Sequence, residues 1–219
     1  MIPRRSPEAL TAFPEPPSVN GERARGRGAR YRSHAMDLLL FRHGEAVENA
    51  PGLGDAGRWL TAKGRRVTRK VARWLDARSS RRPTAIWTSS LVRSVQTAEI
   101  LAAELGLEEE ILVRPELAPS GDLADLVRLI EAHRGRGPLA LVGHEPGLSM
   151  LARNLLGDVT WPGIKKSGVA ALRLTPAEGD GGRREVSFRF LLQPKGMEIV
   201  RSLDVSSLED AAPQPQASA

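Results

Sequence analysis

The sequence predicts an α/β protein: a three-layer α/β/α sandwich on a mainly parallel sheet, with an antiparallel hairpin at the sheet edge. Two observations support this class. Between residue 36 and about residue 200, short apolar runs alternate with segments whose apolar residues recur at helical spacing. In the last third of the chain, two longer runs of alternating polarity flank a glycine-rich segment, which is typical of an antiparallel hairpin.

The first four predicted strands are short and apolar, as expected for strands that are buried on both faces. They are DLLLF (37–41), TAIWTS (84–89), ILV (111–113) and PLALVGH (138–144). The edge hairpin comprises GVAALRL (168–174) and REVSFRFLLQP (184–194), with PAEGDGG (176–182) between them.

Helices are predicted between these strands, over 62–77, 91–106, 122–133 and 147–157. Thr61 is a suitable N-cap for the first helix, because its hydroxyl can accept a hydrogen bond from a free backbone N–H of the first turn. Gly106 marks the end of the second helix, since glycine readily adopts the left-handed conformation that ends helices.

Length and composition indicate one soluble domain. The 219 residues are 41% hydrophobic and 26% charged, as in ordinary globular proteins. The absence of cysteine excludes disulfides, thiolate metal ligands and cysteine nucleophiles. No apolar run approaches the roughly 18 residues that a membrane helix needs. We therefore expect a cytoplasmic protein with no membrane partner.

The basic charge of the chain belongs mostly to its N-terminal segment. The net charge is +6, and residues 1–35 hold seven arginines and three glutamates, which leaves only +2 for the rest. We interpret residues 1–35 as a disordered basic tail, because proline, glycine and arginine dominate it and no apolar periodicity is present. Met36, directly before the first strand, is an alternative start of translation. Residues 36–207 are then a single domain, and residues 208–219 a second disordered tail.

Two predicted strands end in the same way. LLLFRHG and ALVGHEPG each place a histidine, His43 and His144, at the carboxyl end of an apolar run, and Arg93 falls in the first turn of the second helix. The carboxyl ends of parallel strands lie on one edge of the sheet, so Arg42, His43, Arg93 and His144 can converge there. Two guanidiniums, two imidazoles and nearby helix N-termini suit a dianion such as phosphate.

A metal site is the alternative use of the two histidines. Zinc needs about three protein ligands, and the remaining histidines do not help, because His34 lies in the tail and His133 ends a helix. A single histidine at a strand end is also more often structural than catalytic. We expect no metal and no other cofactor.

Five segments, in this order, resemble the histidine phosphatase superfamily, and in particular its small bacterial phosphohistidine phosphatase branch. They are LFRHGEA, DAGRWLTAKG, TSSLVRSVQTAEIL, RPELAPSGD and LVGHEPGLS, which together extend over roughly residues 37–193. The resemblance implies that His43 is a nucleophile that forms a phosphohistidine intermediate, which water hydrolyses. It implies that Arg42 and Arg93 hold the phosphoryl oxygens and that His144 is a further, positively charged donor.

The residues around His43 suggest how it is presented. Gly44 lets the backbone turn close to the ligand without a Cβ atom. We expect one ring nitrogen of His43 to donate to a backbone carbonyl, which would fix the tautomer. Ser90 is a further candidate for phosphate binding, whereas Thr97 is expected to pack in the core.

The general acid is left open between two carboxylates of RPELAPSGD. Glu116 is preferred, because Asp122 is better explained as the cap of the following helix. The small branch lacks the insertion that usually covers the site, so its acid can be weak or absent. That would suit an imidazole leaving group. Asp55 and Arg58 match the D-x-x-R-x-L-T pattern of the family and are expected to pair with each other or to line the rim.

The leading functional prediction is a metal-independent phosphatase that acts on phosphohistidine in a signalling or phosphotransfer protein. The alternative keeps the mechanism but acts on a small phosphate ester or sugar phosphate. A third hypothesis is a non-catalytic module that binds phosphate, or RNA through the arginine-rich tail. The expected partners are accordingly a phosphorylated protein or a small phosphate substrate, with no nucleic acid, and a monomer is expected because no self-complementary apolar face is evident.

Overall fold

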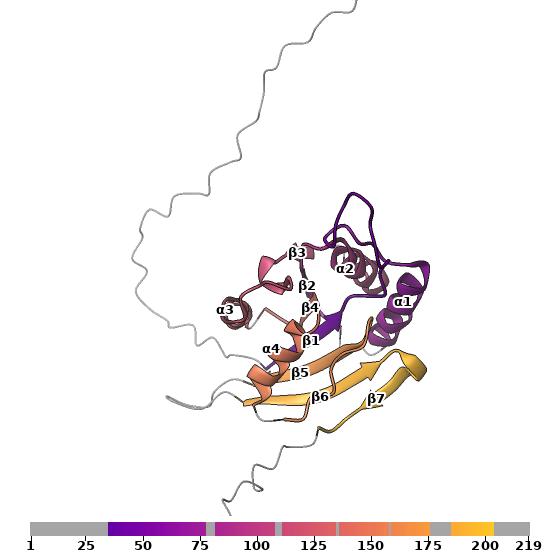
Figure 1. The fold of residues 1–219 in the computed structure, drawn as a ribbon. Helices are drawn as coiled ribbons and strands as arrows, with labels where there is room; N and C mark the ends of the chain where they lie inside the picture. Colours follow the sequence, from indigo (N-terminus) through magenta and orange to yellow (C-terminus); the bar gives the residue numbers. More distant parts are fainter. Residues whose placement is uncertain are drawn as a thin grey trace, which may run out of the picture. The chain divides into compact units, whose positions relative to one another are not determined.

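The computed structural model describes most of the predicted domain (Figure 1). The described residues are 35–77, 82–107, 111–134, 136–157, 159–175 and 185–203. Both predicted tails, apart from Ala35, and the glycine-rich segment 176–182 lie outside these ranges. Within the described ranges, no helix is long and apolar enough to cross a membrane.

A seven-stranded mixed sheet forms the middle layer, in the order β3-β2-β4-β1-β5-β6-β7. Its strands are β1 (Met36–Arg42), β2 (Ala85–Thr88), β3 (Ile111–Val113), β4 (Leu139–Gly143), β5 (Val169–Thr175), β6 (Glu185–Gln193) and β7 (Glu198–Val200). β1 to β4 are mutually parallel, whereas β5, β6 and β7 continue the sheet in antiparallel pairs. The predicted fold class, a parallel core with an antiparallel edge, is confirmed.

Helices cover both faces of the sheet, as Figure 1 shows for α1 and α2 on one side and α3 and α4 on the other. Their bounds are α1 (Ala62–Asp76), α2 (Val92–Leu105), α3 (Leu123–His133) and α4 (Gly147–Leu156). Alternate residues of β1 point to opposite faces, so Leu38 and Leu40 pack on the α3–α4 side and Leu39 and Phe41 on the α1–α2 side. The central run of β1, from Leu38 to Phe41, is therefore apolar and buried on both faces of the sheet.

The predicted caps are confirmed. The Thr61 hydroxyl accepts a hydrogen bond from the Gly64 N–H at 2.9 Å, and the Asp122 carboxylate accepts one from the Asp125 N–H at 2.9 Å. Gly106 ends α2 with φ of 60°. Thr61 and Asp122 each accept from a backbone N–H that has no partner within its helix, whereas Gly106 adopts the left-handed conformation that ends α2.

Three short elements were not predicted. The 3₁₀ turn η2 (Pro115–Leu117) follows β3 and precedes α3, and the 3₁₀ turn η3 (Lys195–Met197) follows β6 and leads into the third element, β7. β7 has only three residues, which is too short for an alternating pattern to be recognised. It forms because β6 offers a free edge for pairing.

Candidate active site

The ends of β1 and β4 bring two histidines together. Arg42 and Gly143 are partners in the parallel ladder, so His43 and His144 follow adjacent positions at the same edge. The His43 N–H donates to the Gly143 carbonyl at 3.1 Å. The two imidazole centroids are 4.8 Å apart, and the side chains are only 8% and 5% exposed. The predicted convergence of the strand ends therefore creates a compact, buried pair.

One ring nitrogen of His43 is committed to the backbone. Its Nδ1 lies 2.7 Å from the Gly44 carbonyl oxygen, which can only accept, so Nδ1 carries the proton. Burial, above all, lowers the pKa of His43 to about 3; the Gly44 hydrogen bond opposes this, and His144, Arg93 and Arg42 add to it. The ring is therefore neutral near pH 7 with a lone pair on Nε2. This confirms the expected contact with a backbone carbonyl.

A side chain at Gly44 would collide with protein neighbours, which is a reason for glycine that the sequence did not reveal. A Cβ atom at this position would lie 2.8 Å from the Thr68 hydroxyl oxygen and 3.1 Å from a Leu60 methyl carbon. The Gly44 N–H donates to the Thr97 hydroxyl at 3.0 Å, and that hydroxyl donates to the Arg93 carbonyl at 2.7 Å. Thr97 is thus buried as expected, but it also joins the loop after β1 to α2.

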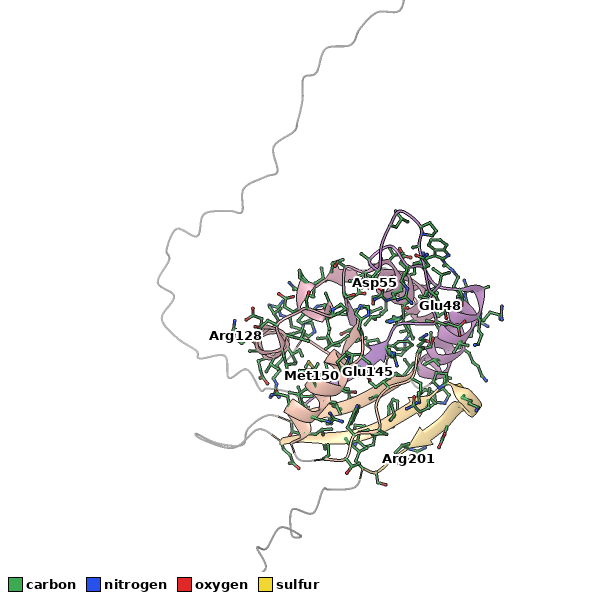
Figure 2. All side chains as sticks on the ribbon, viewed as in Figure 1. Glu48, Asp55, Arg128, Glu145, Met150 and Arg201 are labelled. Carbon is green, nitrogen blue, oxygen red and sulfur yellow. The ribbon has the colours of Figure 1, made fainter. Side chains whose placement is uncertain are left out.

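Arg93 is fixed by the loop between β1 and α1. Its Nη1 donates to the Asp55 backbone carbonyl at 2.7 Å and its Nη2 to the Asp55 carboxylate at 2.9 Å. Asp55, labelled in Figure 2, also accepts from Arg58 at 2.8 Å, which confirms the expected pairing within the loop. Hydrogen bonds from Arg58 and then Arg93 lower the pKa of Asp55. The Asp55 carboxylate is therefore ionised and holds the guanidinium of Arg93 in place.

Arg42 is held from the opposite side by the loop before β5. Its Nη1 donates to the Ile164 carbonyl at 2.9 Å, and the Ile164 N–H donates to the Glu145 carboxylate at 2.8 Å. The other oxygen of Glu145 accepts from the Ser149 N–H at 3.2 Å. The Arg42 Nε is buried and has no partner among the described residues. The backbone of Ile164 thus connects Glu145 to Arg42 through its N–H and its carbonyl, and Arg42 keeps a donor for a ligand.

His144 is flanked by two serines. Its Nε2 lies 2.7 Å from the Ser89 hydroxyl oxygen and 3.1 Å from that of Ser94. Burial and then Arg93 lower the pKa of His144 to about 4. The ring is therefore neutral in the ligand-free protein, so the expected positive charge on His144 is wrong for this state. Ser89 is fully buried, whereas Ser90, the predicted serine, is exposed.

Together these residues form a site with a fixed excess of positive charge. Arg42 and Arg93 are permanently charged, the two imidazoles are neutral, and Asp55 offsets one guanidinium. Within the described residues, no group of three or more histidine, aspartate or glutamate side chains could hold a metal ion. The arrangement can bind a phosphoryl group through charge-assisted hydrogen bonds and offers a neutral nitrogen beside it.

Comparison with known proteins decides the family. Residues 38–118 match the model of the histidine phosphatase superfamily (branch 1). An uncharacterised protein of Picosynechococcus sp. is 38% identical over 143 residues, which cover 63% of this chain and 85% of the relative. The chain belongs to the histidine phosphatase superfamily.

Two further relatives place this histidine phosphatase near the small bacterial branch. The phosphohistidine phosphatase SixA of Escherichia coli is 26% identical over 77% of this chain and 100% of its own length. The structure of the protein histidine phosphatase SixA complexed with tungstate superposes with a TM-score of 0.66 at 25% identity, covering 74% of this chain and all of that one. The protein is accordingly a phosphatase, which confirms the predicted enzyme class.

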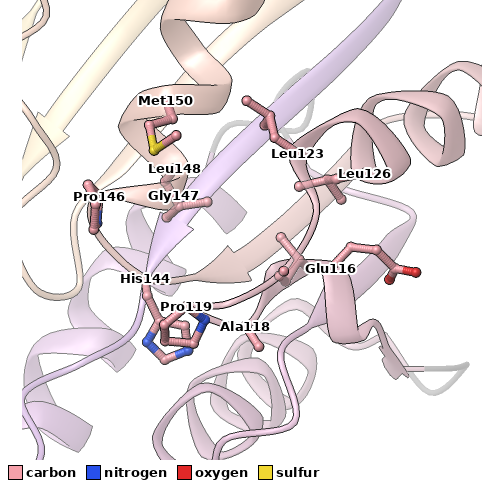
Figure 3. Close-up of a pocket in the computed structure, with 12 residues that line it drawn as sticks. Glu116, Ala118, Pro119, Leu123, Leu126, His144, Pro146, Gly147, Leu148 and Met150 are labelled. Atoms are coloured by element: carbon pink, nitrogen blue, oxygen red, sulfur yellow. The ribbon is translucent and has the colours of Figure 1, made fainter.

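A small pocket lies beside His144 in this histidine phosphatase (Figure 3). Its volume is about 110 Å³, and Glu116, Leu123 and Met150 are among its lining residues. One carboxylate oxygen of Glu116 is buried with no partner among the described residues. In Figure 3 this carboxylate is directed away from the His144 ring, so protonation of a leaving group would require another rotamer. Asp122 is the helix cap, as its alternative explanation required.

Four of the residues that hold the site were not singled out for that role from the sequence: Ser89, Ser94, Asp55 as a partner of Arg93, and Glu145. All four lie inside the motif segments quoted above. Ser89, Ser94 and Glu145 each lie next to a candidate residue, but adjacency in sequence does not reveal the direction of a side chain.

Proposed function

We propose that this phosphatase removes the phosphoryl group from phosphohistidine on a signalling or phosphotransfer protein, through a covalent intermediate on His43. The observation that carries the proposal is the state of His43: neutral, with Nδ1 bound to the Gly44 carbonyl and Nε2 left as the nucleophile. The match to the phosphohistidine phosphatase SixA over its full length supports this substrate class.

In the first step, the Nε2 lone pair of His43 attacks phosphorus in line with the bond to the substrate nitrogen. The new P–N bond forms as the old one breaks, and the electron pair of the old bond leaves with the substrate imidazole. That imidazole carries a proton on its other nitrogen, so it departs as a neutral ring without needing an enzyme acid. The phosphorylated His43 is then cationic, and the Gly44 carbonyl stabilises its Nδ1–H.

In the second step, water attacks the phosphorus of the intermediate. The P–Nε2 bond breaks, its electron pair returns to His43, and the water proton leaves with inorganic phosphate or passes to solvent. Arg42 and Arg93 stabilise the charge on the equatorial oxygens in both transition states, so the mechanism needs no metal ion. His144 lies beside His43, with its Nε2 in contact with the Ser89 and Ser94 hydroxyls, and contributes a further polar contact to the phosphoryl group. Ser90 adds a hydroxyl at the rim.

A small phosphate ester is the second candidate substrate, and Glu116 is the observation that favours it. An alkoxide leaves poorly without a proton. Glu116 lines the pocket beside His144, and one of its carboxylate oxygens has no partner among the described residues, so a change of rotamer would turn an available acid toward the leaving group. Glu116→Gln should then lower turnover of an alkyl phosphate by about a hundredfold, since general acids contribute factors of this order. An unchanged rate for this variant would remove Glu116 from the mechanism.

The test compares phosphate release from a phosphohistidine-bearing protein and from p-nitrophenyl phosphate, with EDTA present. We expect preferential release from phosphohistidine that is lost in His43→Ala. His133→Gln is the matched control, because His133 is a buried histidine that packs against Trp87. Faster turnover of the small ester would favour the second candidate, and no turnover of either substrate would leave the site as a binding pocket.

A further inference from the structure

A wide groove opens beside Arg42 and shares no lining residue with the pocket that contains Glu116. Its volume is about 770 Å³, and its walls come from the start of α1, the loop before β5 and η3. We name it the lysine groove, after the lysines that line it: Lys63, Lys165, Lys166 and Lys195. We propose that the lysine groove docks a carboxylate-rich segment next to the phosphohistidine of the partner protein; this inference rests on the proposed function.

The first argument is the distribution of lysine in the chain. Only five lysines occur among 32 basic residues, and four of them line this groove. The fifth is Lys70, which is exposed further along α1 and does not line it. Arginine elsewhere is the ordinary cation of this chain, so the groove differs from the rest of the surface in the type of its charge.

The second argument is the charge balance. Four lysines and Arg42 face two lining carboxylates, Glu45 and Glu198, which leaves an excess of three positive charges. Lys63 pairs with Glu45 at 2.7 Å, and Lys166 also interacts electrostatically with Glu45, without an ion pair. Lys165 and Lys195 form no ion pair with any described carboxylate, so the groove keeps a positive charge that can attract an anionic partner.

The third argument is the connection to the catalytic residues. Arg42 belongs to both the groove and the phosphate site, and the residue that holds it, Ile164, directly precedes Lys165. The Gln193 side-chain amide fixes this loop at both ends, accepting from the Lys165 N–H at 2.9 Å and donating to the Gly163 carbonyl at 2.9 Å. The Ser167 N–H donates to the His43 carbonyl at 3.1 Å. An anion in the groove is therefore bound next to the group that receives the phosphoryl.

The shape and chemistry favour an acidic chain segment over a second phosphate group. A dedicated phosphate subsite uses arginine forks or converging backbone N–H groups, as at Arg42 and Arg93. The lysine groove instead presents hydrated ammonium groups on flexible stems, spread over three elements of an open cavity of about 770 Å³. Dispersed charges of this kind orient and accelerate the approach of a complementary protein surface.

The test uses two synthetic phosphohistidine peptides of equal length, one flanked by glutamates and the other by glutamines, with the full-length protein. At low ionic strength, we expect the wild-type kcat/KM to be about tenfold higher for the glutamate peptide, and the ratio to fall as salt is added. The double variant Lys166→Glu/Lys195→Glu should reduce the ratio to about one or invert it. Lys70→Glu is the matched control and should retain the wild-type ratio.

Because each variant is judged by the ratio of two peptides, a general loss of activity cannot imitate the effect. A ratio near one in the wild-type protein, or an unchanged ratio in the double variant, would overturn the docking role while leaving the proposed function intact. A loss confined to a small ester that carries a second phosphate group would assign the groove to that ligand instead. Release from neither peptide, with p-nitrophenyl phosphate still hydrolysed, would overturn the docking role and the proposed function together.

Discussion

Asp55 binds the Arg93 guanidinium twice, through its backbone carbonyl at 2.7 Å and its carboxylate at 2.9 Å. Arg93 is 5% exposed, while the Asp55 side chain is largely exposed. Two effects of this pairing oppose each other: the carboxylate orients the arginine, but it also repels an incoming phosphoryl group. Solvent screens the repulsion, because the Asp55 side chain is exposed. The Arg93 guanidinium is buried, so the hydrogen bonds that orient it should have the larger effect on activity.

Asp55→Asn should therefore lower activity. Hydrogen bonds to charged groups contribute about 1.5–3 kcal/mol, which corresponds to roughly a ten- to hundredfold loss in kcat/KM. Steady-state kinetics on p-nitrophenyl phosphate would measure it. Asp125→Asn is the control, since Asp125 pairs with Arg128 on α3. An increase in kcat/KM for Asp55→Asn would show that repulsion dominates.

Glu145→Gln tests the connection from Glu145 to Arg42 through the backbone of Ile164. The amide cannot accept on both sides as the carboxylate does from Ile164 and Ser149, so the Ile164 carbonyl should lose its position and Arg42 its orientation. We expect the inhibition constant for inorganic phosphate to rise about tenfold, by loss of one charge-assisted contact. Glu99→Gln, on the exposed face of α2, is the control.

A structural role alone would lower the melting temperature of Glu145→Gln without changing phosphate affinity in the folded protein. Phosphate inhibition should therefore be measured well below the melting temperature of each variant. Equal inhibition constants for Glu145→Gln and wild type would show that Arg42 does not depend on Glu145.

The two buried histidines should make the protein less stable as the pH falls. Burial above all lowers the pKa of His43 to about 3 and of His144 to about 4, below the ordinary value of 6.5. At pH values between the folded and unfolded pKa values, the unfolded chain binds more protons than the folded protein does. The free energy of unfolding should therefore fall as the pH drops from about 7 to about 5, by roughly 1–2 kcal/mol for each histidine.

Urea unfolding at several pH values would measure this dependence. The double variant His43→Asn/His144→Asn should show a flatter profile than wild type over the same range. His133, whose pKa burial also lowers, is present in both proteins and contributes equally. Identical profiles would mean that neither ring has a pKa lowered by folding, so that both histidines titrate in the folded protein as they do in the unfolded chain.

Gly44→Ala should destabilise the protein and reduce activity, because the new methyl group would meet the Thr68 hydroxyl oxygen at 2.8 Å. Overpacking of this kind costs about 1–3 kcal/mol. Thr68→Ala removes the atom that clashes, so the double variant should regain part of the stability that the single variant loses. Strictly additive effects in this double-mutant cycle would mean that Thr68 is not the residue against which the new methyl group clashes, and that Leu60 or Ser167 is responsible instead.

The fold and the grouping of four site residues were predictable, because both depend only on the order of apolar and polar segments along the chain. Apolar runs followed by polar residues mark strand ends, and parallel strand ends share one edge. Arg42, His43, Arg93 and His144 could therefore be grouped without coordinates. The family motifs then gave the chemistry that such a group performs.

The supporting contacts were not predictable because they depend on side-chain direction and on long loops. Ser89 and Ser90 differ by one residue, yet only Ser89 is buried against His144. Asp55 reaches Arg93 across 38 positions of sequence, from an irregular loop whose path no periodicity describes. The neutral state of His144 in the ligand-free protein was not predictable, because the burial that lowers its pKa is a property of the packed site.

β1 lies between two halves of the sheet whose strands are connected in different ways. On one side it pairs in parallel with β4, and the chain must return through a helix before each new strand. On the other side it pairs antiparallel with β5, so β5 begins where β1 ends, with Val169 opposite Phe41. The loop that enters β5 thus arrives at the catalytic edge directly. If the proposed roles hold, the helix-connected half supplies most of the catalytic residues, and lengthening or recharging the single loop that enters β5 should change substrate choice.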